Sequence, residues 1–142
     1  MRTVRQLLET KTHDVYSVAP EDSVISAIRL MAEKGVGAVL VMQGGQLAGI
    51  VSERDYARKV VLRGRSSSDT PARDIMSADV VTVGPNHTVE RCMQIVTEHR
   101  IRHLPVVEDD QVIGVISIGD LVKAVIEDQQ LELDQLQRYI AS

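Results

Sequence analysis

The chain contains one segment twice, and this repeat constrains its fold more than any other feature. Residues 15–60 align without a gap on residues 80–125, at an offset of 65 positions, with eleven identities in forty-six pairs. A tandem duplication predicts two similar units related by a pseudo-two-fold axis, and the seam between them is a natural place for a ligand. Because a half of about 60–70 residues buries little surface alone, we expect the two halves to pack on each other.

The composition excludes several classes of function. The net charge of −4 and the pI near 5.5 argue against nucleic acid as a partner, since binding to a phosphate backbone needs a concentrated basic surface. Phe and Trp are absent, which removes the stacking platforms of single-strand binders. A single cysteine excludes an intrachain disulfide. We find no apolar run of the kind that marks a secretion signal or a membrane span, so we expect a cytoplasmic protein.

Both copies predict the same order of elements: a strand, a helix, two strands joined by a tight turn, and a second helix. The expected elements of the first copy are a strand at 15–18, a helix from about Val24 capped by Asp22 or Ser23 and ended by Gly35, strands at 38–42 and 47–51 around Gly44-Gly45, and a helix from Ser52 to about Val60. Those of the second copy are a strand at 80–83, a helix that includes residues 89–96, strands at 104–107 and 112–117 around Asp109-Asp110, and a helix from about Ile118.

The remaining segments flank these copies. Residues 3–10 predict a short amphipathic helix, and residues 72–76 repeat its pattern at an offset of 68. We therefore expect a first repeat with its N-terminal helix at 1–62, a polar linker at 63–71, a second repeat at 72–127 and a helical extension at 128–142. Apolar residues over 121–140 predict one long helix or two. Such a stripe usually packs on its own domain, and a subunit interface is the second interpretation.

The motif Gly-apolar-apolar-Ser-x-x-Asp closes both copies, at Gly49–Asp55 and at Gly114–Asp120. Ser-x-x-Asp between a strand and a helix is typical of a capping box, in which both side chains accept hydrogen bonds from free backbone N–H groups. Glu or Gln is the usual last residue of that box, whereas both copies carry Asp. A carboxylate there can also accept two hydrogen bonds from the diol of a ribose, and a helix N-terminus favours phosphate. The two roles are compatible.

The two copies resemble the cystathionine-β-synthase (CBS) domain, whose tandem pair is called a Bateman module. The resemblance rests on Val18–Pro20, Val83–Pro85, the segment His99–Val107 and the two Gly-x-x-Ser-x-x-Asp ends, and it covers nearly the whole chain except its C-terminal tail. It implies a stand-alone bacterial or archaeal protein of class α/β (α+β), with two β-α-β-β-α repeats packed sheet to sheet. It also implies two clefts between the repeats that bind AMP, ADP, ATP, NAD(H) or S-adenosylmethionine.

The same resemblance implies roles for individual residues. Asp55 and Asp120 would hold the ribose hydroxyls, and Ser52 and Ser117 would lie near ribose or phosphate. The residues expected around adenine are Val15, Val36, Gly37 and Ala38 in the first copy, and Val80, Ile101, Arg102 and His103 in the second.

Basic residues differ between the copies. Arg102 and His103 stand where family members place phosphate-binding side chains, although a solvated pair at the start of a strand is the alternative. The first copy has Gly37 and Ala38 there. It carries instead Arg54, Arg58 and Lys59 around Asp55, where the second copy has Gly119, Lys123 and Ala124. Our hypothesis is two sites of different affinity.

No catalytic pattern accompanies these motifs. Cys92 aligns with Ala27 on an apolar helix face, which favours a buried structural thiol. His99 and His103 straddle a predicted helix end, so we expect no zinc site. The leading hypothesis is a non-enzymatic regulatory module that binds an adenine nucleotide without a catalytic cofactor, forms a homodimer and signals to an unknown protein. The alternatives are an enzyme that acts on nucleotides or a redox cofactor, and a structural adaptor without a ligand.

Overall fold

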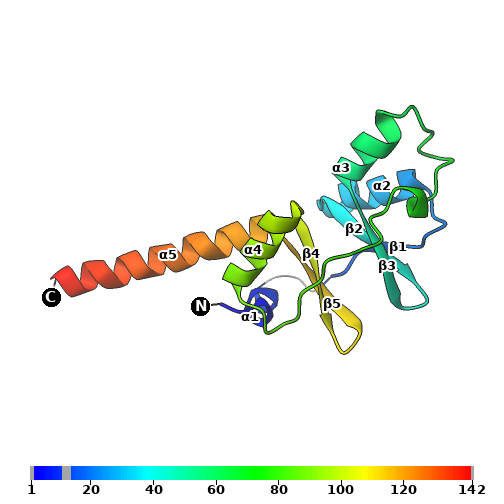
Figure 1. Cartoon of the computed structure of the whole chain (residues 1–142). Coiled ribbons are helices and arrows are strands. Elements are labelled where there is room, and N and C mark those ends of the chain that lie inside the picture. Colours follow the sequence, from blue (N-terminus) through cyan, green and yellow to red (C-terminus); the bar gives the residue numbers. More distant parts are fainter. Residues whose placement is uncertain (1, 11–13, 142) are drawn as a thin grey trace. The chain divides into compact units, whose positions relative to one another are not determined.

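The structure is a computed structural model that describes residues 2–10 and 14–141, and it has the α+β architecture predicted from the repeat (Figure 1). One sheet has three strands in the order β1-β2-β3, and the other consists of β4 and β5. The elements in the described ranges are α1 (Val4–Glu9), β1 (Ser17–Val18), α2 (Val24–Lys34), β2 (Ala38–Gln43), β3 (Gln46–Ser52), α3 (Glu53–Tyr56), the π-helix η1 (Ala57–Val61), the 3₁₀-helix η2 (Ala72–Asp74), α4 (Val89–His99), β4 (His103–Glu108), β5 (Gln111–Ser117) and α5 (Ile118–Ala141).

The chain forms two compact units, and each repeat shares its unit with a segment from elsewhere in the sequence. The first-repeat unit comprises Asp14–Val81 and Asp109–Val112. The second-repeat unit comprises Met1–His13, Thr82–Glu108 and Ile113–Ser142. The N-terminal segment with α1 therefore packs in the unit of the second repeat, while residues 72–81 pack in the unit of the first. The boundaries expected along the sequence stay a prediction; the exchange of these two segments is a finding that the sequence pattern did not contain.

Equivalent contacts hold the two exchanged segments. In the second-repeat unit, α1 docks through a hydrogen bond from Val4 N to His87 O of 2.8 Å, and Leu8 covers Gly114 of β5. In the first-repeat unit, residues after η2 form a bridge to β3, and Met76 covers Gly49. A Cβ atom on Gly49 would lie 2.6 Å from Met76 Sδ, and one on Gly114 would lie 2.7 Å from Leu8 Cδ2. The glycine of each motif therefore makes room for one apolar side chain of the exchanged segment.

The first-repeat unit contains the elements that the sequence predicts, although β1 covers only Ser17–Val18 of the strand expected at 15–18. Helix α2 begins at Ser23, whose side chain accepts a hydrogen bond from Ser26 N, and ends at Gly35, which has a φ of 65°. This left-handed conformation favours glycine, which has no Cβ. The core is aliphatic, and its buried members are Val18, Val24, Ala27, Met31, Val39, Val41, Val51, Val60, Ala72 and Ile75.

The predicted strand at 80–83 is wrong, because only a parallel bridge between Val83 and Val106 forms there. In the first repeat, Leu40 N donates to Tyr16 O, and this bond extends the pairing of β1 with β2. The second repeat has Pro105 at the position of Leu40. Proline has no N–H, so the equivalent bond cannot form and the ladder stops after one pair.

The turns and one helix end show how the second repeat departs from the first. Gly44 and Gly45 both have positive φ, and Asp109 and Asp110 adopt the same conformation, which confirms both predicted tight turns. Helix α4 ends at Arg100 with a φ of 53°, at the position that Gly35 holds in the first repeat. A side chain with a Cβ is strained in that region, so the second repeat is locally less favourable here.

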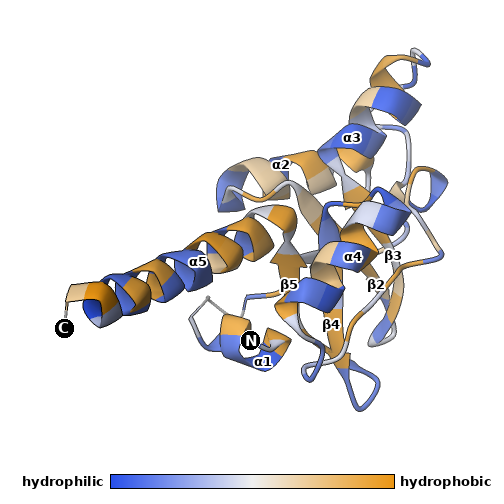
Figure 2. Ribbon diagram, turned by 60° about the vertical axis from the view of Figure 1, so that its left-hand side comes forward, coloured by the Kyte–Doolittle hydropathy of each residue, from blue (hydrophilic) through white to orange (hydrophobic). Residues whose placement is uncertain are grey.

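The helices that follow the motif differ between repeats. In the first repeat the predicted helix is α3 followed by the π-helix η1. In the second repeat a single continuous α5 of 24 residues resolves the choice between one helix and two. Its first turns bury Leu121 and Ala124. Every residue from Gln129 to Ala141 is exposed, so the expectation that the apolar stripe packs on its own domain is wrong for that half (Figures 1 and 2).

Candidate functional site

The Ser-x-x-Asp motif forms a reciprocal cap in both repeats. Ser117 N donates to Asp120 Oδ2 at 2.8 Å, and Asp120 N donates to Ser117 Oγ at 3.1 Å. The corresponding distances for Ser52 and Asp55 are 2.9 and 3.2 Å. The capping interpretation of the motif is therefore confirmed. Each aspartate is fixed at the start of a helix, where the partial positive charge of the helix dipole stabilises its carboxylate.

Backbone hydrogen bonds bring other predicted residues to these caps. Glu53 N donates to Gly37 O at 3.1 Å, and Ile118 N donates to Arg102 O at 2.8 Å. Ala38 is also the strand partner of Ser52. The residue before β2 or β4 thus lies beside the start of the helix that carries the aspartate, and the two regions named from the sequence meet within each unit.

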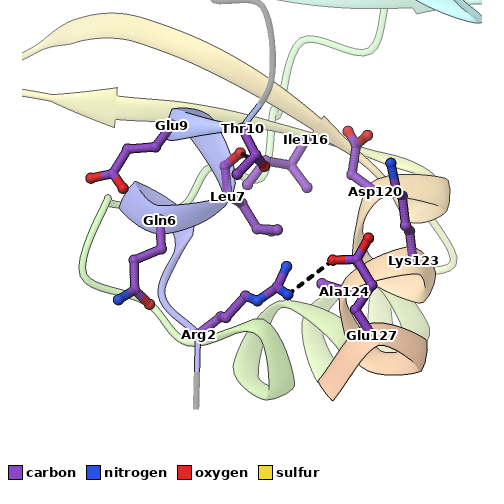
Figure 3. A pocket seen from close by; sticks show the side chains of 10 residues that line it. All are labelled: Arg2, Gln6, Leu7, Glu9, Thr10, Ile116, Asp120, Lys123, Ala124 and Glu127. Atoms are coloured by element: carbon purple, nitrogen blue, oxygen red, sulfur yellow. Dashed lines mark hydrogen bonds and ion pairs between the residues drawn. The ribbon is translucent and has the colours of Figure 1, made fainter. Parts of the chain in front are cut away.

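Asp120 lines a pocket of about 640 Å³ in the second-repeat unit (Figure 3). Side chains of α1 and its flanks border one side, and side chains from the start of α5 border the other. The lining residues are Arg2, Gln6, Leu7, Glu9, Thr10, Ile116, Asp120, Lys123, Ala124 and Glu127. The exchanged N-terminal segment therefore completes this pocket, and its volume suits a small ligand.

The charges around this pocket are of both signs. Arg2 donates to Glu127 at 2.9 Å and pairs with Asp128 at 3.2 Å, which ties the N-terminal segment to α5. Lys123 is one turn after Asp120 on the same face of α5. Two cationic and three carboxylate side chains line the pocket in all. Its described lining is therefore slightly acidic and does not form a concentrated phosphate site.

The equivalent aspartate of the first-repeat unit is held by a lysine. Lys59 Nζ lies 3.3 Å from Asp55 Oδ1 and donates to Ile75 O at 2.9 Å. Ser52 N and Oγ both donate to the other carboxylate oxygen. Lys59 aligns with Ala124, and Ile75 aligns with Leu7, which both line the pocket of the other unit. The side chain of Lys59 thus extends into the position where the second repeat has only a methyl group.

The other predicted residues divide between the two units. Val36 and Gly37 line a separate pocket of about 460 Å³ beside α2 and α3. The side chains of Arg54, Arg58 and Arg102 are exposed, and those of Val15, Ile101 and His103 are half-buried. Val80 is half-buried and belongs to the first-repeat unit, whereas Asp120 belongs to the second-repeat unit.

Of the ten residues that line the pocket, only Asp120 was predicted as a site residue. Lys123 and Ala124 were noted only as the counterparts of Arg58 and Lys59, and the other seven are Arg2, Gln6, Leu7, Glu9, Thr10, Ile116 and Glu127. The sequence contained one signal for these residues. The pattern of residues 4–8 recurs at 72–76, at an offset of 68, which indicates that the N-terminal segment belongs to the repeated architecture.

Cys92 is fully buried on α4, as predicted. Burial raises the pKa of its thiol, and nearby Arg91 opposes this shift. A thiol with a raised pKa is a poor nucleophile, so Cys92 is not a candidate for catalysis.

Among residues 2–10 and 14–141, no group of three or more His, Cys, Asp or Glu side chains could hold a metal ion. In the same ranges, no helix has the length and apolar character that crossing a membrane requires.

Comparisons with known proteins converge on one family. The family model described as CBS domain matches residues 4–62 and 72–127. The mitochondrial CBS domain-containing protein CBSX3 of Arabidopsis thaliana is 45% identical over 125 residues, which are 84% of this chain and 61% of that protein. The CBS domain-containing protein YhcV of Bacillus subtilis is 34% identical over 80% of both chains. The chain thus spans about three fifths of the Arabidopsis relative and four fifths of the Bacillus one.

Solved structures show the same likeness. A putative signal-transduction protein with CBS domains from Burkholderia ambifaria has a TM-score of 0.87 and 54% identity, and the match covers 90% of this chain and 96% of that one. The CBS domain pair of protein MJ0100, solved with 5-methylthioadenosine and S-adenosyl-L-methionine, has a TM-score of 0.80 over 90% of this chain and 98% of its own. At 18% identity, this second likeness concerns the fold alone.

Proposed function

Because the chain belongs to the CBS domain family, we propose that it is a regulatory module that binds an adenosyl ligand at Asp120 and catalyses no reaction itself. The observation that carries the proposal is the position of Asp120, fixed by its cap in the wall of a pocket of about 640 Å³. A carboxylate held in this way can accept two hydrogen bonds from a vicinal diol, and hydrogen bonds to a charged acceptor are strong.

The rest of the pocket supports the same class of ligand. Leu7, Ile116 and Ala124 provide apolar contacts for a base or a sugar ring. The adenosyl ligands of the MJ0100 domain pair belong to that protein, and they support the proposal only as an analogy.

The charge of the lining ranks the candidate ligands. With two cations and three carboxylates, the described lining does not offset the charge of a triphosphate. We therefore place AMP, NAD(H) and S-adenosylmethionine, which carry fewer negative charges, ahead of ADP and ATP. The exposed Arg102 is the remaining candidate for a phosphate, beside the start of α5 through its backbone carbonyl.

The two repeats would not bind alike. The Lys59 side chain occupies space beside Asp55, whereas the residue aligned with Lys59 in the second repeat is Ala124, whose short side chain lines the pocket at Asp120. Because Ala124 leaves more room for a ligand, we propose that the Asp120 site is the tighter one. Ligand binding would favour one conformation of the chain, which we expect to be a cytoplasmic homodimer, and a regulated protein would respond to that change.

Calorimetry with separate variants tests the proposal. Asp120→Asn keeps an oxygen that can cap α5 and removes the charge that would hold the diol. We expect it to abolish tight binding of the best ligand among adenosine, AMP, ATP, NAD and S-adenosylmethionine, with guanosine as the control, while Asp55→Asn has a smaller effect. Equal losses in the two variants, or no binding by the unmodified chain, would refute the proposal. Incubation with ATP or NADH, followed by product analysis, tests the enzyme alternative.

A further inference from the structure

The exposed half of α5 carries an apolar seam with heptad spacing. Ile126, Leu133 and Ile140 are seven residues apart, and Val122, Gln129 and Leu136 form a second series three or four residues away from them. Alternating spacings of three and four residues keep side chains on one face of a helix, and this is the a/d pattern of a coiled coil. Figure 2 shows apolar residues recurring along the whole helix.

These side chains lie in solvent. The exposed fractions are 42% for Val122, 59% for Ile126, 53% for Leu133, 55% for Leu136 and 74% for Ile140. Scattered exposed apolar residues are common, but a row of them along one face of a helix, interrupted here only by Gln129, marks an interaction surface. We propose that this seam pairs with the same helix of a second copy of the chain, in a parallel two-stranded arrangement.

The residues of the seam favour a second copy of the chain as the partner. Ile126 and Ile140 at a with Leu136 at d are the residues that favour a parallel pair, whereas Leu133 at a and Val122 at d depart from this pattern. Gln129 would face Gln129 of the second copy, where two amides can hydrogen-bond. The flanking charges agree with a parallel orientation. In a parallel pair, Glu132 faces the uncharged Gln137 of the second copy. In the antiparallel pair that aligns the same seam, Glu132 would face Glu132 of the second copy, and like charges repel.

The apolar area of the seam sets how tightly we expect two chains to associate. From the exposed fractions, the five apolar side chains offer about 300 Å² per chain, since complete burial of such a side chain removes roughly 60–120 Å². Two chains would therefore bury about 600 Å² of apolar side-chain surface, which is below the roughly 1,200 Å² of stable specific interfaces and is typical of weak association. We therefore expect association in the micromolar range. The inference concerns the homodimer expected above and does not depend on nucleotide binding, so either experiment can fail without affecting the other.

Sedimentation velocity of the full chain across the micromolar range tests the proposal. The matched variants are Leu133→Lys in the seam and Leu131→Lys outside it, since both leucines are exposed on the same helix. We expect Leu133→Lys to raise the Kd of the dimer about tenfold or more, because it places a charge in the interface. Leu131→Lys should change it less than about twofold. An unmodified chain that stays monomeric, or equal effects of the two variants, would overturn the inference.

A cysteine at position 136 tests the orientation. In a parallel pair the two Leu136→Cys side chains face each other and form an intermolecular disulfide on mild oxidation. In the antiparallel pair each faces residue 126, and the two cysteines lie about 15 Å apart along the axis, too far for a disulfide. The unmodified chain is the control, since Cys92 is fully buried. A dimer that Leu133→Lys weakens but Leu136→Cys does not crosslink would refute the parallel arrangement.

Discussion

Replacing Lys59 should convert the first repeat from a weak site into a second competent one. Lys59 bonds to Asp55 and to the carbonyl of Ile75, and it therefore competes with any ligand that needs the Asp55 carboxylate. Lys59→Ala removes both the charge and the side chain, and it recreates what Ala124 provides in the second repeat. Lys59→Met removes the charge but keeps most of the volume, so the two variants separate the effect of the ion pair from that of space.

The size of the effect follows from the geometry. At 3.3 Å the direct attraction between the two charges is about 5 kcal/mol at an effective dielectric constant of 20. Most of this is offset by solvation, because the Lys59 side chain is 37% exposed, and exposed pairs contribute about 0.2–1 kcal/mol net. Once released from Lys59, the Asp55 carboxylate can also make charge-assisted hydrogen bonds to the ligand, which adds to the gain in binding free energy. We expect about 1–2 kcal/mol in total, or roughly a 5- to 30-fold tighter Kd at this site.

Calorimetry in an Asp120→Asn background isolates the first site. Lys59→Ala should produce measurable binding of the ligand identified for the Asp120 site, and Asp55→Asn should abolish it again. Arg63→Ala is the matched control, because it removes an exposed cation that follows the same π-helix and is not a predicted site residue. If Lys59→Ala and Arg63→Ala bind alike, Lys59 does not restrict this site. Thermal unfolding of each variant checks that loss of the bond to Ile75 leaves the unit folded.

The remaining predictions concern stability and reactivity. Arg100→Gly should raise the free energy of unfolding by about 0.5–1 kcal/mol, because glycine removes the strain at a positive φ, and chemical denaturation that shows a decrease would contradict this. Gly49→Ala should cost about 1–3 kcal/mol, since the new Cβ would lie 2.9 Å from the backbone oxygen of Ser77. Gly114→Ala should cost less in the same assay, because its close neighbours are atoms of the flexible Leu8 side chain. Iodoacetamide should label Cys92 slowly in the folded chain and rapidly after denaturation, because burial raises the pKa of the thiol; the same shift implies that stability falls as the pH rises through that pKa.

Local sequence signals predicted most of the fold. The cap expected at Asp22 or Ser23, the stop at Gly35 and the two tight turns each depend on residues that are neighbours in the chain. The structure confirms them, with Ser23 as the cap. The duplicated motif likewise predicted that Ser52 and Asp55 form a cap. Such features are set by the backbone conformation and hydrogen bonds of a few adjacent residues, so a pattern of residue types is sufficient to find them.

Features that depend on distant partners were not predictable in the same way. No strand forms at 80–83 because Pro105, more than twenty residues away in the chain, has no N–H to donate to that segment. The pocket at Asp120 includes Arg2, because an exchanged segment completes it. The pairing of Lys59 with Asp55 was within reach of the sequence, since the two are four residues apart, but its consequence depends on Ile75. Each of these contacts joins parts of the chain whose proximity only the tertiary fold establishes.

The exchange of segments between the units has a consequence for a broken chain. A protease that cleaves between Arg65 and Asp69 would produce two fragments, each of which contains a piece of the other's hydrophobic core. The N-terminal fragment would carry Val4, Leu7 and Leu8, which are buried in the second-repeat unit, and the C-terminal fragment would carry Ala72 and Ile75, which are buried in the first. The nicked protein should therefore elute as one species in native buffer and separate into fragments only in denaturant. The covalent link between the repeats would therefore be needed while the chain folds, but not to hold the folded protein together.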